Sequence, residues 1–321
     1  MTAPARVNPF RYPGAGGVPA PPLECEHPPP CDCHLSIDTA EANFAEFQER
    51  FAELGGLQRH GLLVPVGGPT KCGKTSLINR CVTWAHRTLR RQSIRVLACD
   101  LSDIGRSPGM TMDDRTTRTG LRLTTLVSRN QQIHDPAVLR ADDDKPADLA
   151  ERLVRLSESL AENVVVILVA PPVPAPAIDL VEVQRYWAAT YPKLLIFVEH
   201  SNVDCKEKIR NEWGHARGAR SACLEMGFLR PGDGATFTRA RIHVPGRKAT
   251  FPDMEVDALD KIIGDGAMSI GFAQAMLFDL YESYLRRPHP PWPSGDTVTV
   301  DDLRAFFLER FLRDHAGDRA G

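Results

Sequence analysis

The sequence predicts an α/β protein that has helices on both faces of a mainly parallel sheet and a helical subdomain towards its C-terminal end. Two observations predict this fold class. From about residue 37 to residue 246, short apolar runs alternate with helical patterns, which is typical of parallel strands joined by crossover helices. From residue 247 to 321 the pattern changes to three apolar helical faces. We therefore expect a leader at 1–36, an α/β core at 37–246 and a helical subdomain at 247–321.

The composition disfavours several classes of protein. The 321 residues are 42% hydrophobic and 25% charged, which is ordinary for a folded chain with a sizeable core. A formal net charge of −2 provides no broad basic field, so direct nucleic-acid binding is not expected. No apolar run reaches the roughly 18 residues of a membrane span, and the N-terminus lacks the apolar core of a secretion signal. We expect a cytoplasmic protein with reduced cysteines and no membrane partner.

The first 36 residues are rich in Pro, Gly and Ala and show no periodicity, which predicts a flexible leader. Within it lie several soft metal ligands, and four of them could surround a zinc ion, namely Cys25, Cys31, Cys33 and His34. Their spacing fits no common zinc finger. An unstructured Cys/His tract is therefore the alternative interpretation.

The next segment, residues 38–54, is expected to be a helix. Asp38 and Glu41 are suited to its first turn, and Phe44, Phe47 and Phe51 recur at helical spacing. Such a stripe indicates a helix that packs its aromatic face against the core.

Residues Gly68 to Thr75 read G-P-T-K-C-G-K-T, a full match to the phosphate-binding loop pattern G-x-x-x-x-G-K-[ST]. An apolar run, 62–66, precedes the loop, and an amphipathic helix, 75–91, follows it. Strand, glycine loop and helix are the context that this motif requires. The fold class is therefore refined to a three-layer P-loop NTPase with a C-terminal helical subdomain.

Each part of the loop has a physical role. Gly68 and Gly73 allow the backbone to curl, so that successive N–H groups form a nest for an anion. Lys74 reaches the outer phosphates, and the Thr75 hydroxyl holds Mg²⁺, while the helix dipole favours the same phosphates. We expect ATP and Mg²⁺ as cofactors, contacted by the loop residues Gly68, Pro69, Thr70, Lys71, Cys72, Gly73, Lys74, Thr75 and Ser76.

Cys72 has two interpretations. A thiol beside Lys74 could be redox-sensitive, because a nearby cation lowers a thiol pKa. The simpler interpretation is a small residue that fills the loop.

The remaining elements of the core follow in order. Apolar runs predict strands at 93–100, 163–170 and 193–199, and a weaker run predicts a last strand at 239–244. Residues 104–116 are polar and are expected to form a mobile loop. Helical spacing predicts further helices near 121–127, 149–160 and 178–190, with a possible basic-faced helix within 205–226.

Hydrolysis would need a carboxylate beside the phosphates, in addition to the loop. Such an acid normally closes an apolar strand, but the most apolar strand ends in Ala170. The strand before it ends in Asp100, and the strand after it ends in Glu199. Asp100 is a candidate magnesium ligand and Glu199 a candidate catalytic or sensing residue. For each, a solvated acid at a strand end is the alternative.

The order of these parts resembles the AAA+/STAND group of P-loop ATPases, in particular the origin-recognition-like ATP-binding proteins common in bacteria. The resemblance covers residues 40–321, and the phosphate loop is its one specific motif. It implies that Ala170 stands where the Walker B acids would be, and that Ser201 or Asn202 stands near a polar sensor. Family lids often offer an arginine or a proline to the nucleotide, whereas residues 264–269 offer neither.

The leading functional hypothesis is an ATP-binding switch with weak ATPase activity, which controls self-association or the binding of a protein partner. A small-molecule or nucleotide kinase could use the same loop. A GTPase is less favoured, because the guanine-reading Asn-Lys-x-Asp pattern is absent. A nucleotide-binding scaffold without turnover is the remaining alternative, and Ala170 favours it.

Overall fold

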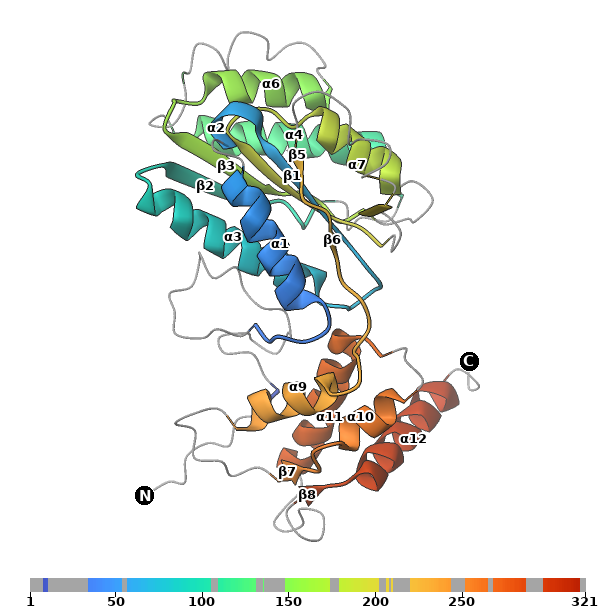
Figure 1. The fold of residues 1–321 in the computed structure, drawn as a ribbon. Helices are drawn as coiled ribbons and strands as arrows, with labels where there is room; N and C mark the ends of the chain where they lie inside the picture. The colour runs from blue at the N-terminus through green and yellow to red at the C-terminus, as the bar shows by residue number, and fades with distance from the viewer. Residues whose placement is uncertain are drawn as a thin grey trace, which may run out of the picture.

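The computed structural model describes residues 8–10, 34–53, 57–104, 109–130, 135, 148–173, 179–201, 206–207, 209, 220–243, 252–264, 268–286 and 297–317. These segments form two bodies, an α/β domain and a helical subdomain, which Figure 1 shows one above the other. The phosphate loop lies on the side of the α/β domain that faces the helical subdomain, since its residues contact the helices there.

All described strand pairs of the α/β domain are parallel. The strands are β1 (Leu62–Gly67), β2 (Arg95–Asp100), β3 (Val164–Val169), β4 (Leu194–Glu199), β5 (Arg220–Ser221) and β6 (Leu224–Glu225). Their order is β2-β3-β4-β1-β5, and β6 also pairs with β1. The predicted α/β class with a mainly parallel sheet is therefore confirmed. β1, which leads into the phosphate loop, has β4 as its neighbour on one side.

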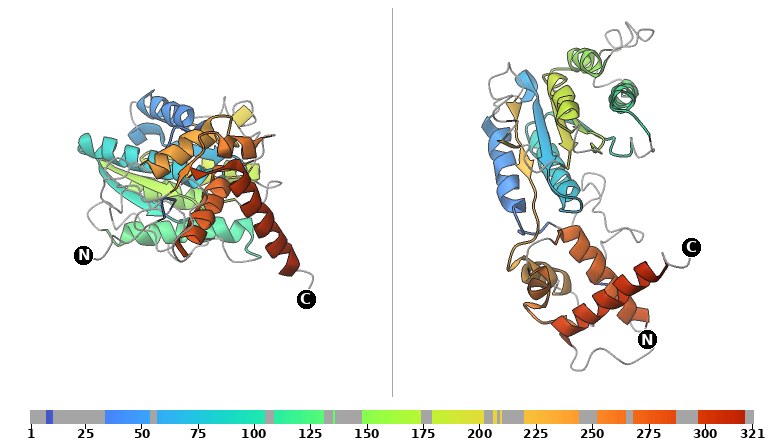
Figure 2. Two further views of the ribbon diagram at one scale, coloured as in Figure 1. Left: turned by 90° about the horizontal axis from the view of Figure 1, so that it is seen from below. Right: turned by 90° about the vertical axis from the view of Figure 1, so that its right-hand side faces the viewer.

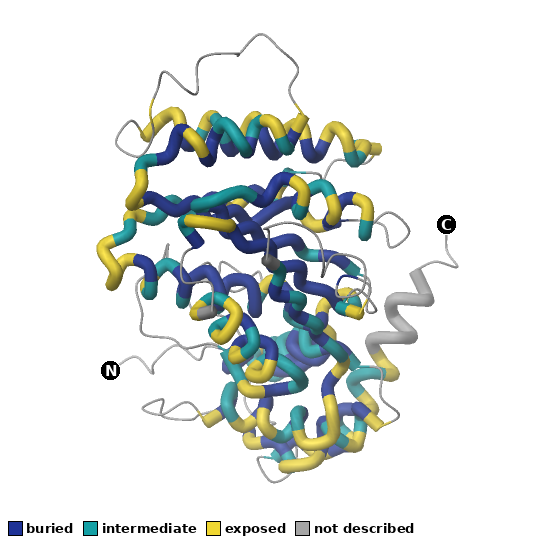
Figure 3. Tube along the Cα trace, turned by 45° about the horizontal axis from the view of Figure 1, so that its top comes forward, coloured by how far each residue is buried: buried dark blue, intermediate teal, exposed yellow. Residues whose placement is uncertain are grey.

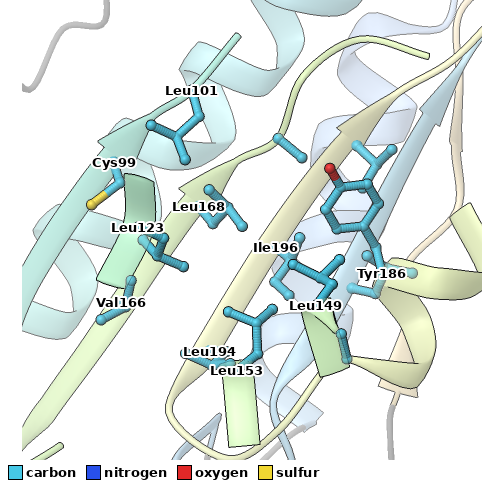
Figure 4. Packing of buried hydrophobic residues seen from close by; sticks show 14 of the residues in the cluster. Cys99, Leu101, Leu123, Leu149, Leu153, Val166, Leu168, Tyr186, Leu194 and Ile196 are labelled. Carbon is cyan, nitrogen blue, oxygen red and sulfur yellow. The ribbon is translucent and has the colours of Figure 1, made fainter. Parts of the chain in front are cut away.

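Helices cover both faces of this sheet (Figures 1 and 2). One layer contains α1 (Ala40–Glu53), α2 (Leu57–His60) and α3 (Lys74–Arg91); the other contains α4 (Met112–Ser128), α6 (Leu149–Ser159) and α7 (Asp179–Ala188). β3 is buried throughout, and its side chains alternate between the two layers. Val166 and Leu168 pack on the side of α4 and α6, as Figure 4 shows, whereas Ile167 packs on the side of α3. The apolar sequence of β3 is continuous because both of its faces are buried.

A buried ion pair joins α4 to α7 within the second layer. Arg115 donates two hydrogen bonds to Glu182, at 3.3 Å and 2.5 Å, and a third at 2.9 Å to the Met110 carbonyl. The side chains of Arg115 and Glu182 are 3% and 0% exposed. Beside them the Tyr186 hydroxyl contacts Thr119, and burial raises the pKa of Tyr186. The geometry satisfies both charges, which a buried pair requires.

The helical subdomain has its own apolar core. It contains α9 (Asp233–Ile242), α10 (Ala258–Ile263), α11 (Ile270–Arg286) and α12 (Val300–Gly317), with a short parallel pair, β7 (Asp253–Met254) and β8 (Thr297–Val298). Figure 3 shows dark blue segments turned inward in both bodies and yellow segments outward. No helix in the described part of the chain is long and apolar enough to cross a membrane.

The strand predicted at 239–244 is wrong for its described residues, because 239–242 belong to α9 and His243 follows the end of that helix. The Asp260 carboxylate accepts hydrogen bonds at 3.0–3.1 Å from the backbone N–H groups of Gly232, Gly234 and Ala235 at the start of that helix. Phe237 and Ile242 then enter the core of the helical subdomain. Long-range capping and burial outweigh the local strand pattern, and α9 packs with the C-terminal helices rather than with the sheet.

Two further local predictions are corrected. The loop expected at 104–116 gives way to α4 at Met112, because Thr111 and Asp114 form a reciprocal capping box. Within the segment 205–226, where a basic-faced helix was suggested, residues 206, 207 and 209 are helical. The suggestion is corrected only at the end of the segment, where β5 and β6 extend the sheet beside β1.

The leader contains an ordered anchor at residues 8–10. Phe10 is buried, and its ring lies 5.8 Å from that of Phe237 and 5.0 Å from that of Tyr281. Asn8 donates to the Phe278 carbonyl at 2.8 Å. These three residues are therefore part of the helical subdomain's core, and the expectation of a flexible leader is wrong for them.

The Arg115–Glu182 pair gives a stability prediction. Arg115→Met leaves a buried, uncompensated carboxylate, and we expect it to lower the free energy of unfolding by about 3–5 kcal/mol, measured by urea denaturation. The double variant Arg115→Met/Glu182→Leu should recover most of that loss. Arg155→Met, which removes an exposed pair with Glu151 in the same layer, should cost less than about 1 kcal/mol. Equal losses for Arg115→Met and Arg155→Met would contradict the argument.

Candidate nucleotide-binding site

The phosphate loop has the backbone conformation that its glycines predict. Gly68 and Gly73 have φ values of 137° and 96°, and Lys71 between them has φ 63°. A Cβ on Gly68 would lie 2.3 Å from the Met226 carbonyl oxygen, so only glycine fits there. Gly73 is the N-cap of α3, which begins at Lys74. The free N–H groups of the first turn of α3 therefore lie at the loop, where they suit an anion.

Lys74 and Thr75 both face Glu199. The Lys74 ammonium donates to the carbonyls of Gly68 and Pro69, both at 2.7 Å, and lies 3.8 Å from Glu199 Oε1. The Thr75 hydroxyl donates to Glu199 Oε2 at 2.9 Å. One carboxylate thus approaches the two side chains that a phosphate loop uses for phosphate and for metal.

The parallel pairing of β1 with β4 brings Glu199 to this place. In that pairing Val66 lies opposite Glu199, so the carboxylate leaves β4 beside the point where β1 enters the loop. The carboxyl ends of parallel strands form one edge of the sheet, which is where ligands bind in such folds.

Asp100, the other candidate acid, lies elsewhere. It ends β2, the edge strand, which β3 and β4 separate from β1. Three strand spacings amount to about 14 Å. Its register partner is Val169, which in turn pairs with Phe197, two residues short of Glu199. Asp100 is exposed and accepts a hydrogen bond from the backbone of Ser102 at 2.9 Å. The structure does not bring Asp100 to Thr75.

β3, the strand beside β4 at which an acid was expected, ends without one. Ala170 is buried directly after β3, so no carboxylate follows that strand. Val173 donates from its backbone to the Glu199 carbonyl at 2.9 Å, which ties this segment to the end of β4. Ser201 is partly buried just beyond Glu199, and Asn202 lies outside the described residues.

A cavity runs from the loop to the helical subdomain. Its empty space is about 820 Å³, which includes open solvent at its mouth. Four groups of residues line it: residues 34–40 up to the start of α1, the loop with the start of α3, residues 226–229 after β6, and α9 with α11. Those in contact with the loop side are Cys72, Gly73, Ser76, Leu77 and Arg80, and those from the helical subdomain include Phe237, Arg241, Ile270, Gly271 and Gln274.

The helical subdomain touches the loop directly. The Gly271 N–H in the first turn of α11 donates to the Lys71 carbonyl at 2.8 Å. A Cβ on Gly271 would lie 2.8 Å from that oxygen and 2.9 Å from Lys71 Cβ. The lid thus meets the loop through α11, a few residues beyond the 264–269 segment considered from the sequence. A glycine opening an apolar helix is too weak a signal to reveal this contact.

A second connection joins the segment before α1 to the start of α9. The Asp38 carboxylate accepts from the Gly227 N–H at 2.6 Å, and the Asp38 N–H donates to Asp233 at 3.0 Å. Asp233 also accepts from the Arg230 N–H at 2.7 Å. These bonds fix the crossing from β6 to α9, where the two bodies meet.

Cys72 is buried, and burial raises the pKa of its thiol although Lys74 opposes the shift. The thiol form therefore predominates, which favours the interpretation as a packing residue over a reactive one. The proposed zinc ligands Cys25, Cys31 and Cys33 lie outside the described residues. His34 is described and lines the cavity. Within the described segments, no three His, Cys, Asp or Glu side chains gather as a metal site.

The contact between α11 and the loop gives a second prediction. Gly271→Ala places a methyl group against the Lys71 backbone, and overpacking of this kind costs about 1–3 kcal/mol. We expect faster amide hydrogen exchange over 268–286 as the lid loosens. Gly120→Ala is the matched control, because the one tight contact of its Cβ would be with the movable end of the Arg152 side chain at 2.9 Å, while Leu149 lies at an ordinary contact distance of 3.5 Å. Unchanged exchange in Gly271→Ala would contradict a close lid contact.

Comparison with known proteins identifies the fold. No protein-family model matches the chain, and no curated protein matches it in sequence. Among solved structures it is similar to the ADP form of the ORC2 protein of Aeropyrum pernix, with 14% identity, a TM-score of 0.50, and coverage of 89% of this chain and 72% of that one. It is also similar to Drosophila ORC bound to DNA, with 12% identity, a TM-score of 0.49, and coverage of 90% of this chain and 70% of that one. A third similar structure is Cdc6p from Pyrobaculum aerophilum, with 13% identity, a TM-score of 0.45, and coverage of 80% of this chain and 63% of that one. The first likeness and the sheet order together show an α/β fold like that of the Aeropyrum pernix ORC2 protein.

Proposed function

We propose that the chain binds ATP with Mg²⁺ in the phosphate loop and acts as a nucleotide-controlled switch with slow ATP hydrolysis. The observation that carries this proposal is the convergence of Glu199 on Lys74 and Thr75 at the end of the loop. The Aeropyrum pernix protein with this fold is described in an ADP form, which supports nucleotide binding by a chain of this fold. We further propose that the chain is one of the bacterial origin-recognition-like or STAND proteins.

The residues present fit these cofactors. A Cβ on Gly68 would collide with the Met226 carbonyl that follows β6, so glycine lets the loop pass close to that segment. The N–H groups in the first turn of α3 suit the phosphates. Lys74 is held by two carbonyls of the loop, and it would exchange these for phosphate oxygens. The Thr75 hydroxyl would hold Mg²⁺, and the charge of the ion would offset the negative charge of the phosphates.

Glu199 then has the role of the missing strand-end acid. Its carboxylate lies at the metal and phosphate end of the loop, where it can accept the proton of an attacking water. β3 would normally provide this group, but it ends in Ala170. An acid on β4 occupies a neighbouring place on the same edge of the sheet. Asp100 is not part of this proposal, because two strands separate it from β1.

The lid converts binding into a conformational signal. The cavity is lined by both bodies, and α11 donates directly to the loop backbone at Lys71. A nucleotide that contacts both bodies favours the closed arrangement by its differential affinity for the two states. We propose that the change between the open and the closed arrangement of the two bodies controls association with a second copy or with a protein partner.

Variants of the two acids and of the lysine test the proposal. Lys74→Ala removes a charge-assisted contact and should weaken ATP binding, measured by calorimetry, about 10- to 100-fold. Glu199→Gln keeps the shape but not the base, so ATP affinity should stay within about threefold while phosphate release falls about 100-fold or more. Asp100→Asn is the matched control, and both quantities should stay at the wild-type value.

The same measurements separate the alternatives. Tight binding by the wild type with no phosphate release would support the scaffold without turnover, which the absence of an acid after β3 favours. Phosphate transfer to an added small-molecule or nucleotide acceptor would support a kinase. Hydrolysis that survives Glu199→Gln but not Asp100→Asn would overturn the role given to Glu199.

A further inference from the structure

Gln274 of α11 is a buried polar side chain on the wall of the cavity. It is 5% exposed and lines the same cavity as Gly73 and Ser76. A buried amide normally has its hydrogen-bonding groups satisfied. The partners of its nitrogen and its oxygen therefore show what this wall can bind.

The nitrogen of Gln274 is accounted for. Its NH₂ group donates to the backbone carbonyl of Phe10, and Phe10 is held by its ring contacts with Phe237 and Tyr281. A carbonyl oxygen can only accept, so the amide must present its nitrogen to Phe10. The hydrogen bond to Phe10 therefore fixes the orientation of the Gln274 amide, with the nitrogen towards the Phe10 carbonyl and the oxygen pointing away from it.

The oxygen of Gln274 is not accounted for. Oε1 is buried and has no hydrogen-bond partner among the residues that the structure describes. Leaving such an acceptor unsatisfied costs about 1–3 kcal/mol. An unprotonated phosphate oxygen could not relieve this cost, because it is itself an acceptor. The partner must be an N–H or O–H group.

We propose that Gln274 Oε1 accepts a hydrogen bond from the nucleoside half of the bound nucleotide, either from a sugar hydroxyl or from an exocyclic amino group of the base. Phe10 is the positioning residue, because its carbonyl fixes the amide. Gln274 then determines which nucleoside is preferred, whereas the affinity for the phosphates depends on the loop. This inference rests on the proposed function, since it requires a nucleotide in the cavity.

The test compares ligands that lack one donor at a time. Calorimetry on the full chain with Mg²⁺ uses ATP, 2′-deoxy-ATP, 3′-deoxy-ATP and purine riboside triphosphate, which has no 6-amino group. The wild type should prefer ATP over one of the three analogues by about 3- to 10-fold, the value of one neutral hydrogen bond. In Gln274→Met, which has a similar shape and no acceptor oxygen, that preference should fall to within about twofold.

Tripolyphosphate serves as the ligand control, because it engages the loop alone, and its affinity should be equal in the wild type and Gln274→Met. If the wild type binds neither ATP nor tripolyphosphate, the proposed function itself fails. If it binds ATP and Gln274→Met keeps the same preferences, water satisfies the oxygen and the inference is overturned. The analogue whose penalty disappears in the variant identifies the donor as sugar or base.

Phe10 has a separate test. Phe10→Ala removes the anchor that positions the carbonyl, so it should reduce the ligand preference as Gln274→Met does, with tripolyphosphate binding unchanged. Phe10→Leu keeps an apolar anchor and should restore the preference. A preference that is unaltered in Phe10→Ala, with 8–10 confirmed to be displaced by amide exchange, would exclude the positioning role.

Discussion

The pairing of β1 with β4 is the constraint on which the candidate site depends. Because Val66 lies opposite Glu199 in this parallel pair, the strand that leads into the phosphate loop and the strand that ends in an acid finish side by side. Thr75 and Lys74, which open α3 after the loop, then meet the Glu199 carboxylate at 2.9 Å and 3.8 Å. A shift of one residue in this register would turn Glu199 to the other face of the sheet.

The fold and the loop could be predicted from the sequence because their signals are local. The pattern from Gly68 to Thr75 specifies its own backbone, and β3 is an apolar run that only two-sided burial explains. The choice between Asp100 and Glu199 could not be made in the same way. Both acids end apolar strands, and only the strand order places one beside β1 and the other at the edge.

The errors arose where distant groups decide the local structure. Residues 239–242, part of the segment predicted as a strand, belong to a helix whose start is capped by Asp260, some twenty residues later. Residues 8–10 look like the rest of a Pro- and Gly-rich leader, but the ring of Phe10 fills a place between Phe237 and Tyr281. Neither contact has a signature in the adjacent sequence. The same holds for Gln274, whose position on the cavity wall depends on how α11 meets the loop.

The cavity unites these features, since the loop, the segment before α1 and the lid each supply part of its wall. Nucleotide binding at the loop is tested most directly by a calorimetric titration of the full wild-type chain with ATP in magnesium buffer. The account predicts saturable binding of one nucleotide per chain, lost when the magnesium-bound triphosphate is replaced by adenosine alone. A folded protein that gives no binding heat with ATP, GTP or their diphosphates at several temperatures would contradict it.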